Sequence, residues 1–409
     1  MAAEREFCRV TVTPKAERSL RAGHPWVFSD EVTAAGEHEN GDIVDVFSQK
    51  DRYLGSGFIN DRSKIRVRII SRNANDRFDE AFWRRRVRYA LDYRRTVMGD
   101  AFDCCRLIFG EADMFPGLTV DRFGSILCAQ VLSLGTERVK DVIFTALADE
   151  LREMGQNIEA IYERNDASLR EKEGLPQFKG FYPLPGLRCD PEGHTVIREN
   201  GILYDVDYIN GQKTGFFLDQ KFNRLAAAEI ARGRRVLDCF THTGAFGLNC
   251  AAAGAQRVVS VDISRDAIEM SRRNAALNGL DGRIEYICAD VFELLTQMAQ
   301  EGRRGEFDYI ILDPPAFTKS SATVKNAVRG YKEINLKAMR LLPRGGYLAT
   351  CSCSHFMTDE LFRKMLHDAA HDADVSLRQI EARQQGPDHP ILWSAPETDY
   401  LKFYIFQVV

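Results

Sequence analysis

The chain has 409 residues, of which 44% are hydrophobic, and its formal net charge is −4 at pH 7. That length predicts two or three domains with sizeable cores, and the charge does not by itself indicate a nucleic-acid partner. No apolar run reaches the roughly 18 residues that a membrane span needs, and residues 1–9 are polar. We therefore expect a cytoplasmic protein without a membrane span or a secretory signal.

The ten cysteines mostly stand singly within apolar runs, as Cys128, Cys250 and Cys288 do, and none forms a Cys-x-x-Cys pair. This distribution predicts reduced thiols and no disulfide framework. It also predicts that the protein has no structural metal site.

Residues 1–73 are predicted to form a first domain, a small β barrel. Short β-like runs at 9–12, 42–47, 53–59 and 64–70 are separated by turn-forming residues. Between the first two runs, a short helix stopped by Gly23 leads into an aromatic strand that contains Trp26. His24 and Trp26 are equally compatible with packing and with RNA contact.

A local excess of positive charge lies between Arg62 and Arg95, where twelve Lys or Arg residues stand against four acids. Within it, Lys64, Arg66 and Arg68 alternate with apolar residues, so one strand would carry three cations on its outer face. Such a strand can contact phosphates, or it can simply be a solvated, protected edge.

Residues 74–185 are predicted to form an α+β middle domain. We expect an exposed helix over 78–97, a hairpin turn at 121–124, a helix over 137–154 and a strand over 160–163. Its expected role is to place the substrate, and we assign no chemical site to it.

Residues 186–409 carry the candidate chemistry, starting with a strand at 203–209 and the sequence Gly-Phe-Phe-Leu-Asp-Gln after it. This segment has two interpretations. It is either a turn that faces a ligand, or a helix that Asp219 caps with Arg224 on its surface.

The stretch from Arg235 to Ile263 predicts a strand, a tight Gly turn, a helix and a second strand that ends at Asp262. A carboxylate in that place can accept both hydroxyls of a ribose. The turn around Gly244 lacks the Gly-x-Gly-x-x-Gly spacing that cradles a pyrophosphate, which favours a nucleoside ligand without one. The alternative is an ordinary βαβ core unit.

Two further acidic residues at expected strand ends follow in chain order. Asp290 is expected to end the third strand, and Asp313 directly follows the fourth strand in the sequence Asp-Pro-Pro-Ala-Phe. The prolines fix a rigid turn at the edge of the sheet, so the Asp313 region can face a planar substrate base.

The fifth strand runs into Cys351-Ser352-Cys353-Ser354. C5 of a pyrimidine is a poor nucleophile until a thiolate adds to C6, so a cysteine beside the Asp313 turn suits methylation at C5. Strand alternation puts Cys351 and Cys353 on one face, and spacing alone does not separate them. Both could also be inert core thiols.

These motifs resemble class I S-adenosylmethionine methyltransferases. Together with Gly-His-Pro-Trp-Val-Phe at 23–28, Arg-Gly-Tyr at 329–331 and Ser-Cys-Ser at 352–354, they stand in the order typical of the ribosomal RNA large subunit methyltransferase I family. The resemblance implies an α/β fold with a PUA-like RNA-binding barrel (1–73), an α+β middle domain (74–185) and a Rossmann-like methyltransferase sheet (186–409).

The resemblance also implies S-adenosylmethionine as cofactor, 23S ribosomal RNA as substrate and 5-methylcytosine as product. It nominates Cys353 as nucleophile and Asp313 as its catalytic partner. The residues that it implies for cofactor binding are Asp219, Gln220, Arg224, Asp238, Thr243, Gly244, Ala245, Asp262, Ile263, Asp290, Val291 and Asp313. Among these, Asp238 could equally serve the amides of its own loop.

In the implied mechanism, the Cys353 thiolate adds to C6 of a cytosine drawn out of its stack, and Asp313 supports protonation at N3. The base that removes the C5 proton is unidentified, because no cysteine occurs at 314–317. A 5-methyluridine enzyme, a base N-methyltransferase and a non-catalytic assembly factor are the alternatives. A homodimer is left open.

Overall fold

The computed structural model describes residues 6–189, 193–318 and 320–409. The chain divides into two compact units. The N-terminal unit comprises Met1–Thr195, Val206–Leu218 and Pro387–Thr398, and the C-terminal unit comprises Val196–Asp205, Asp219–Gly386 and Asp399–Val409. The boundaries predicted at 73/74 and 185/186 stay predictions. No helix in the described ranges is long and apolar enough to cross a membrane.

The N-terminal unit begins with a six-stranded sheet in the order β2-β6-β5-β4-β1-β3. Its strands are β1 (Cys8–Val12), β2 (Trp26–Phe28), β3 (Val32–Ala35), β4 (Ile43–Ser48), β5 (Tyr53–Ile59) and β6 (Ile65–Ser71), and α1 (Pro14–Arg21) follows β1. Alternate apolar residues of these strands, with Ala16 and Leu20 of α1, form one buried core. The four strands, the short helix and the aromatic strand expected here are confirmed, and β3 was not predicted.

The cations predicted on the outer face of β6 are largely engaged with acids. Val67 and Ile69 are fully buried, as the alternation predicts. Arg68 donates to Glu111 at 3.3 Å and to Glu173 at 2.9 Å, and Arg66 pairs with Asp61. Lys64 is exposed. Most of the local charge excess is therefore balanced within the unit, which weakens the phosphate-contact interpretation.

The second sheet of the N-terminal unit has five strands in the order β11-β10-β9-β8-β7. They are β7 (Cys104–Phe109), β8 (Leu118–Phe123), β9 (Ile126–Val131), β10 (Ala160–Asn165) and β11 (Phe178–Phe181), with α2 (Glu80–Met98), α3 (Leu134–Glu153) and α4 (Leu169–Lys172). A hairpin joins β8 and β9, as predicted, but its turn begins at Gly124, which takes a φ of 63°. The predicted turn at 121–124 starts too early, because residues 121–123 still pair with β9.

The prediction of an exposed helix over 78–97 is wrong for one face of α2. Its buried residues include Trp83, Leu91 and Arg94. Arg94 is fully buried because its guanidinium forms an ion pair with Asp113 at 2.5 Å. Arginine spacing alone suggested a solvated helix, whereas tertiary partners allow charged residues to be buried.

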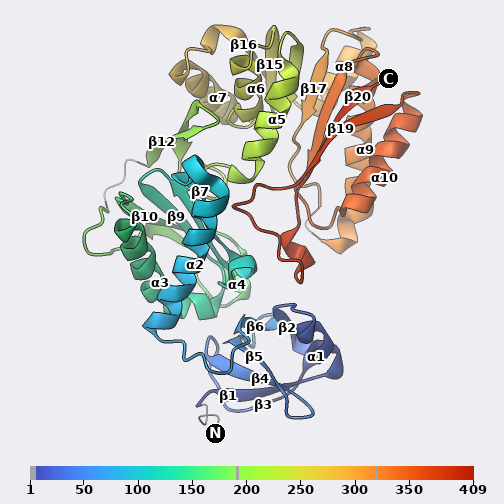
Figure 1. Cartoon of the computed structure of the whole chain (residues 1–409). Coiled ribbons are helices and arrows are strands. Elements are labelled where there is room, and N and C mark those ends of the chain that lie inside the picture. The colour runs from blue at the N-terminus through green and yellow to red at the C-terminus, as the bar shows by residue number, and fades with distance from the viewer. Residues whose placement is uncertain (1–5, 190–192, 319) are drawn as a thin grey trace. The chain divides into compact units, whose positions relative to one another are not determined.

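The C-terminal unit contains a seven-stranded sheet in the order β16-β15-β14-β17-β18-β20-β19 (Figure 1). The strands are β14 (Arg235–Cys239), β15 (Arg257–Asp262), β16 (Ile284–Cys288), β17 (Tyr309–Leu312), β18 (Tyr347–Ser352), β19 (Leu377–Arg383) and β20 (Lys402–Val408). The first five are parallel, and β20 is antiparallel to both neighbours. Strand order reverses between β14 and β17, which is where α/β sheets of this kind bind ligands.

Helices cover both faces of this sheet. The helices are α5 (Lys221–Ala231), α6 (Ala245–Ala252), α7 (Arg265–Leu277), α8 (Val291–Gln300), α9 (Val324–Leu341) and α10 (Asp359–Asp372), and β12 (His194–Glu199) pairs with β13 (Ile202–Asp207) beside them. Residues of α8, α9 and α10 share one buried cluster with β14, β17 and β18, while α5, α6 and α7 lie on the other side of the sheet (Figure 1). The expected Rossmann-like α/β fold is confirmed.

Candidate cofactor and active site

The loop between β14 and α6 turns sharply, because Phe240, His242 and Gly244 all take positive φ angles of 62°, 50° and 84°. Such angles are costly for non-glycine residues and persist where the surroundings enforce them. Two residues of α7 hold the loop from behind. The Ser271 hydroxyl donates to the carbonyl of His242 at 2.7 Å, and the Asn274 amide donates to the carbonyl of Thr243 at 2.9 Å.

Gly244 and Ala245 form the start of α6. A Cβ atom at Gly244 would stand 3.0 Å from the Cβ of Ser271, so the close approach of loop and helix requires glycine there. Ala245 is buried as the first residue of the helix. The helix N-terminus therefore lies directly beyond the end of the central strand.

Asp238 braces this loop from inside. Its Oδ2 accepts hydrogen bonds from the Thr241 hydroxyl at 2.5 Å, the Gly247 amide at 2.9 Å and the Ser260 hydroxyl at 3.3 Å. Its Oδ1 is buried without a hydrogen-bond partner in the described part of the chain. Burial raises the pKa of Asp238 to about 7, despite the three hydrogen bonds that lower it. This arrangement favours the alternative that Asp238 serves its own loop.

Asp262 ends β15, as predicted, and its two carboxylate oxygens each accept one amide hydrogen bond at 2.9 Å. Oδ2 receives the amide of His242, and Oδ1 receives the amide of Ser264. Each oxygen keeps lone-pair capacity for a further donor such as a ribose hydroxyl. The next residue, Ile263, is 69% exposed, so its side chain offers an apolar surface beside that carboxylate.

His242 carries no charge at neutral pH. Burial lowers the pKa of its imidazole to about 4, and Asp262 offsets only part of that effect. The charged group that accepts the His242 amide is therefore the carboxylate of Asp262.

Asp290 lies two residues beyond β16 and caps α8, so the prediction that it ends the third strand is wrong by two residues. Its Oδ1 accepts the amides of Phe292 at 2.7 Å and Glu293 at 3.1 Å. The strand ends earlier because Asp is a strong helix N-cap. Val291 is buried in the core shared by α8 and the sheet, so only its backbone can meet a ligand.

Arg224 is not on the surface of α5, so the interpretation of a capped surface helix is wrong. Arg224 is 3% exposed and its Nη1 lies 2.6 Å from an Oε of Glu199, which is fully buried on β12. The N-cap position of α5 is Gln220, whose side chain makes no capping bond. The side chain of Asp219 instead accepts the hydroxyl of Tyr400 at 2.6 Å.

Gln220 links two predicted site residues at the ends of β17 and β18. Its amide nitrogen donates to Oδ1 of Asp313 at 3.1 Å and to the sulfur of Cys351 at 3.4 Å. The Cys351 thiol donates to the same Asp313 oxygen at 2.9 Å. Burial raises the pKa of Asp313, with these two hydrogen bonds opposing the rise.

The structure distinguishes the two cysteines that spacing could not. Cys351 is buried within β18, and burial together with Asp313 raises the pKa of its thiol well above the usual value. Cys353 lies one residue beyond the strand and is partly exposed, with its sulfur 4.0 Å from the carbonyl oxygen of Pro314. Cys351 is therefore held as a thiol, and Cys353 is the more accessible of the two.

Aromatic side chains support the turn behind these residues. The rings of Phe317 and Tyr331 lie 4.5 Å apart between centroids, and the Tyr331 hydroxyl accepts the Ser352 hydroxyl at 3.0 Å. A Cβ at Gly330 would stand 3.3 Å from the Phe317 ring. These contacts show that Gly330 and Tyr331 of the Arg-Gly-Tyr motif pack against the turn, whereas Arg329 is exposed.

Two residues near this site were missed from sequence. Tyr400 bonds Asp219, and Lys402 donates to the carbonyl of Ser354 at 2.8 Å. The available signal was a single lysine in the apolar run Leu401 to Phe406.

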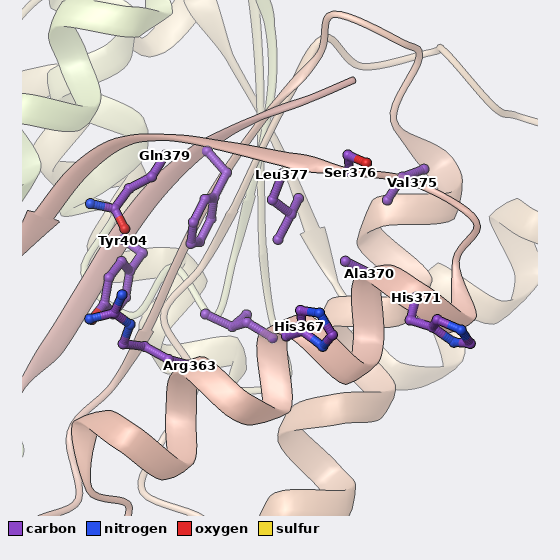
Figure 2. Close-up of a pocket in the computed structure, with 11 residues that line it drawn as sticks. Arg363, His367, Ala370, His371, Val375, Ser376, Leu377, Gln379 and Tyr404 are labelled. Atoms are coloured by element: carbon purple, nitrogen blue, oxygen red, sulfur yellow. The ribbon is translucent and has the colours of Figure 1, made fainter.

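A pocket on the outer side of α10, β19 and β20 contains none of the predicted site residues. Figure 2 shows Arg363, His367 and His371 on the helix, with Leu377 across from His367 and Tyr404 beside Arg363. Both histidines are more than four-fifths exposed. No group of three or more metal-ligating side chains exists among the described residues.

Comparisons with known proteins agree with this geometry. Residues 186–404 match the family model of S-adenosylmethionine-dependent methyltransferases, and residues 10–72 match that of a PUA-like domain. The chain is 41% identical over 406 residues to Ribosomal RNA large subunit methyltransferase I of Shewanella denitrificans, covering 98% of this chain and 99% of the relative. It is 38% identical to the protein of the same name from Klebsiella pneumoniae strain 342, with the same coverage.

The fold is also similar to that of solved structures. SMU.776, a candidate methyltransferase crystallised with SAH, superimposes with a TM-score of 0.83 at 21% identity, covering 98% of this chain and all of that one. A candidate methyltransferase from Streptococcus mutans gives a TM-score of 0.81 at 22% identity, with the same coverage. These two likenesses show that the chain has the same fold as these proteins.

Proposed function

Since the chain belongs to the S-adenosylmethionine-dependent ribosomal RNA large subunit methyltransferase I family, we propose that it methylates C5 of a cytosine in 23S ribosomal RNA through a covalent adduct of Cys353 with C6. The observation that carries this proposal is the pairing of a partly exposed thiol at the end of β18 with the Asp313 turn at the end of the neighbouring β17. An accessible thiol in this place is what methylation at C5 of a pyrimidine requires.

The side chains beyond the strand ends fit the cofactor. Asp262 retains acceptor capacity for ribose hydroxyls, Ile263 offers an apolar surface and the α6 N-terminus supplies amide dipoles. When bound, S-adenosylmethionine supplies an electrophilic methyl group on a sulfonium. We propose that Asp262, Asp290, Gln220 and the loop at Thr243 to Ala245 hold it.

Cys353 is proposed as the nucleophile. Its thiolate forms a bond to C6 of the cytosine, the C5–C6 double bond breaks, and the electron pair is delocalised toward N3. C5 then has the nucleophilic character needed to accept the methyl group. A base, which is unidentified, then removes the C5 proton, and the electron pair left at C5 restores the C5–C6 double bond as the C6–S bond breaks. The thiolate leaves, and N3 returns its proton to the Asp313 carboxylate.

Asp313 is proposed to hold the proton that N3 receives. Its raised pKa keeps a larger protonated fraction near neutral pH than an exposed aspartate would have. Gln220 and Cys351 both bond one of its oxygens, which fixes the orientation of the carboxyl group. A positioned acid of this kind favours the adduct by neutralising charge as it develops.

The experiment that tests the proposal is mass-spectrometric nucleoside analysis of 23S ribosomal RNA from cells that lack the protein. We expect 5-methylcytidine to decrease by one residue per 23S molecule, and to return with the wild-type chain or with Cys351→Ser. Cys353→Ala should not restore it. Unchanged 5-methylcytidine in the deletion strain would overturn the proposal, and a change in 5-methyluridine instead would reassign the substrate base.

The covalent step has its own test. RNA that contains 5-fluorocytidine cannot lose a proton from C5, so the adduct should accumulate as a protein–RNA band that resists denaturation. We expect the band with the wild type and with Cys351→Ser, and none with Cys353→Ala. An N-methyltransferase would give no band with any of the three proteins and would keep its turnover in Cys353→Ala.

The remaining partners follow from the substrate. Ribosomal RNA is assembled in the cytoplasm of bacteria, so we propose that location for the protein. The PUA-like domain is proposed to contribute to RNA binding. The homodimer stays a prediction, which sedimentation of the purified chain would check.

A further inference from the structure

Lys402 is a buried cation in an otherwise apolar edge of the site. It begins β20, whose sequence is Lys-Phe-Tyr-Ile-Phe-Gln-Val, and it is only 4% exposed. Lysine is rarely buried to this degree without an acidic partner. Among the described residues, its ammonium group has no carboxylate within ion-pair distance and bonds only two carbonyl oxygens.

Lys402 contacts the residues on both sides of Cys353 in the chain. In the antiparallel pairing of β18 and β20, Lys402 lies opposite Ser352. Its Nζ donates to the carbonyl of Ser354 at 2.8 Å and to the carbonyl of Tyr400 at 3.1 Å. The residue before Cys353 is thus paired with the Lys402 backbone, and the residue after it is bonded to the Lys402 side chain.

These contacts leave the ammonium group with unused capacity. An ammonium has three N–H donors, and two of them are directed at neutral carbonyls. The positive charge interacts electrostatically with Asp399 and Asp359 and, to a smaller extent, with Cys353. A positive charge in a site of low polarity stabilises a neighbouring thiolate more strongly than it would in water.

Two carboxylates act electrostatically on Lys402 without forming an ion pair with it, and each accepts a hydrogen bond from a neutral group. Asp359, at the start of α10, accepts the hydroxyl of Tyr404, and Asp399 accepts the side-chain amide of Gln384 at 3.2 Å. Around Cys353, burial raises the pKa of the Cys351 thiol and of the Tyr331 hydroxyl, and the imidazole of His355 follows two residues later in the chain.

We propose that Lys402 is a positioning residue for Cys353, holding the Ser352–Ser354 turn and stabilising the negative charge of the Cys353 thiolate. The proposal rests on the proposed role of Cys353 as nucleophile. The Sγ–H bond of Cys353 breaks heterolytically, the proton passes to solvent, and the charge left on sulfur is stabilised by Nζ. Burial lowers the pKa of Lys402 only to about 8, so most of it is still an ammonium at pH 7.

The test is the pH dependence of Cys353 alkylation by iodoacetamide in the full chain without RNA, measured by mass spectrometry of the Cys353 peptide. The exposed Cys288 in the same digest serves as the internal reference. For Lys402→Met we expect the apparent pKa of Cys353 to rise by about one unit, which means about tenfold less thiolate at pH 7. Lys402→Arg, which keeps the charge, should shift it far less.

Two controls separate positioning from folding. Lys364→Met, which removes a lysine that is 70% exposed on α10, should leave the profile unchanged. Calorimetric S-adenosylmethionine binding reports whether each variant is folded. If Lys402→Met fails to bind, Lys402→Gln replaces it, because the amide still donates a hydrogen bond but carries no charge, and it should show the same shift.

An alkylation profile of Lys402→Met or Lys402→Gln that superimposes on the wild type would overturn the inference, whatever happens to turnover. That outcome differs from failure of the proposed function, which would appear as retained methylation by Cys353→Ala. The alkylation experiment uses neither RNA nor product, so the two results are independent.

Discussion

At the scale of single residues, Asp238 shows how a motif acid can serve the fold. Its carboxyl group holds the loop through Thr241, Gly247 and Ser260, and burial raises its pKa from 3.8 to about 7. The folded state therefore binds a proton that the unfolded state has released between those two values. The stability contributed by this proton is full below about pH 4 and is lost as the pH rises to about 7.

Asp238→Asn resembles the protonated acid and should remove this pH dependence. We expect the wild type to lose about 1.4 kcal/mol of unfolding free energy per pH unit relative to the variant, from roughly pH 4 to pH 7. Urea unfolding of the cofactor-free chain at several pH values measures the difference. A constant difference between the two proteins across that range would show that Asp238 does not titrate there.

Asp313 offers a second prediction at this scale. Asp313→Asn keeps an oxygen that can accept from Gln220 and Cys351 but holds no transferable proton. We expect the single-turnover rate of methyl transfer at saturating S-adenosylmethionine to fall by about 100-fold or more. A rate within about threefold of the wild type would exclude proton transfer through Asp313.

At the scale of elements, the buried pair of Arg224 and Glu199 joins α5 to β12. Removing one partner of a buried ion pair leaves a charge in a poorly solvated place, which typically costs 3–5 kcal/mol. We expect Arg224→Met to lose about 3 kcal/mol of unfolding free energy. The double variant Arg224→Met/Glu199→Leu should recover most of it, because no buried charge then remains.

Arg272→Met is the matched control, since Arg272 faces Glu269 at 3.9 Å with about half of each side chain exposed. It should change the free energy of unfolding by less than about 1 kcal/mol.

The double variant Arg224→Met/Glu199→Leu also tests the predicted cofactor role of Arg224. If it binds S-adenosylmethionine like the wild type, Arg224 supports the fold, whereas a clear loss of affinity would indicate a direct contact.

At the scale of the whole molecule, residues 387–398 belong to the N-terminal unit although they lie near the end of the chain. Ser394 lies against Gly23 of the barrel, and His24 bonds Glu397 at 3.4 Å. The Thr398 hydroxyl accepts the amide of Leu392 at 2.9 Å, which fixes the loop. His24 and the partly buried Trp26, which donates to Glu111 at 3.0 Å, are thus engaged in packing.

This fixed loop presents Trp393, which is 96% exposed. Unpaired RNA bases stack on aromatic side chains, and each such contact is worth roughly 1–3 kcal/mol. We expect Trp393→Ala to weaken binding of a 23S fragment by about tenfold in fluorescence anisotropy, with unchanged S-adenosylmethionine binding. Tyr89→Ala, an exposed aromatic on α2, is the control. Equal affinity of Trp393→Ala and the wild type would exclude stacking there.

The sequence by itself determined the local features. The periods of strands and helices, the glycine turn after β14, and the acids at the ends of β14, β15 and β17 were predicted from the sequence. They follow from spacing and turn chemistry that involve near neighbours in the chain. Parallel strands end at one edge of a sheet, so the sequence alone predicts those acids at one crevice.

Only the tertiary structure decided which side chains are buried and with what partners. Cys351 and Cys353 have the same strand parity, yet one bonds Asp313 inside β18 and the other lies beyond its end. From the sequence, Arg94 and Arg224 look like surface residues, but in the structure each forms a buried ion pair with an acid from another segment, Asp113 and Glu199 respectively. The hydrogen bond between Lys402 and Ser354 joins residues that are 48 positions apart in the chain. Burial and ion pairing depend on contacts between remote segments, which local spacing does not encode.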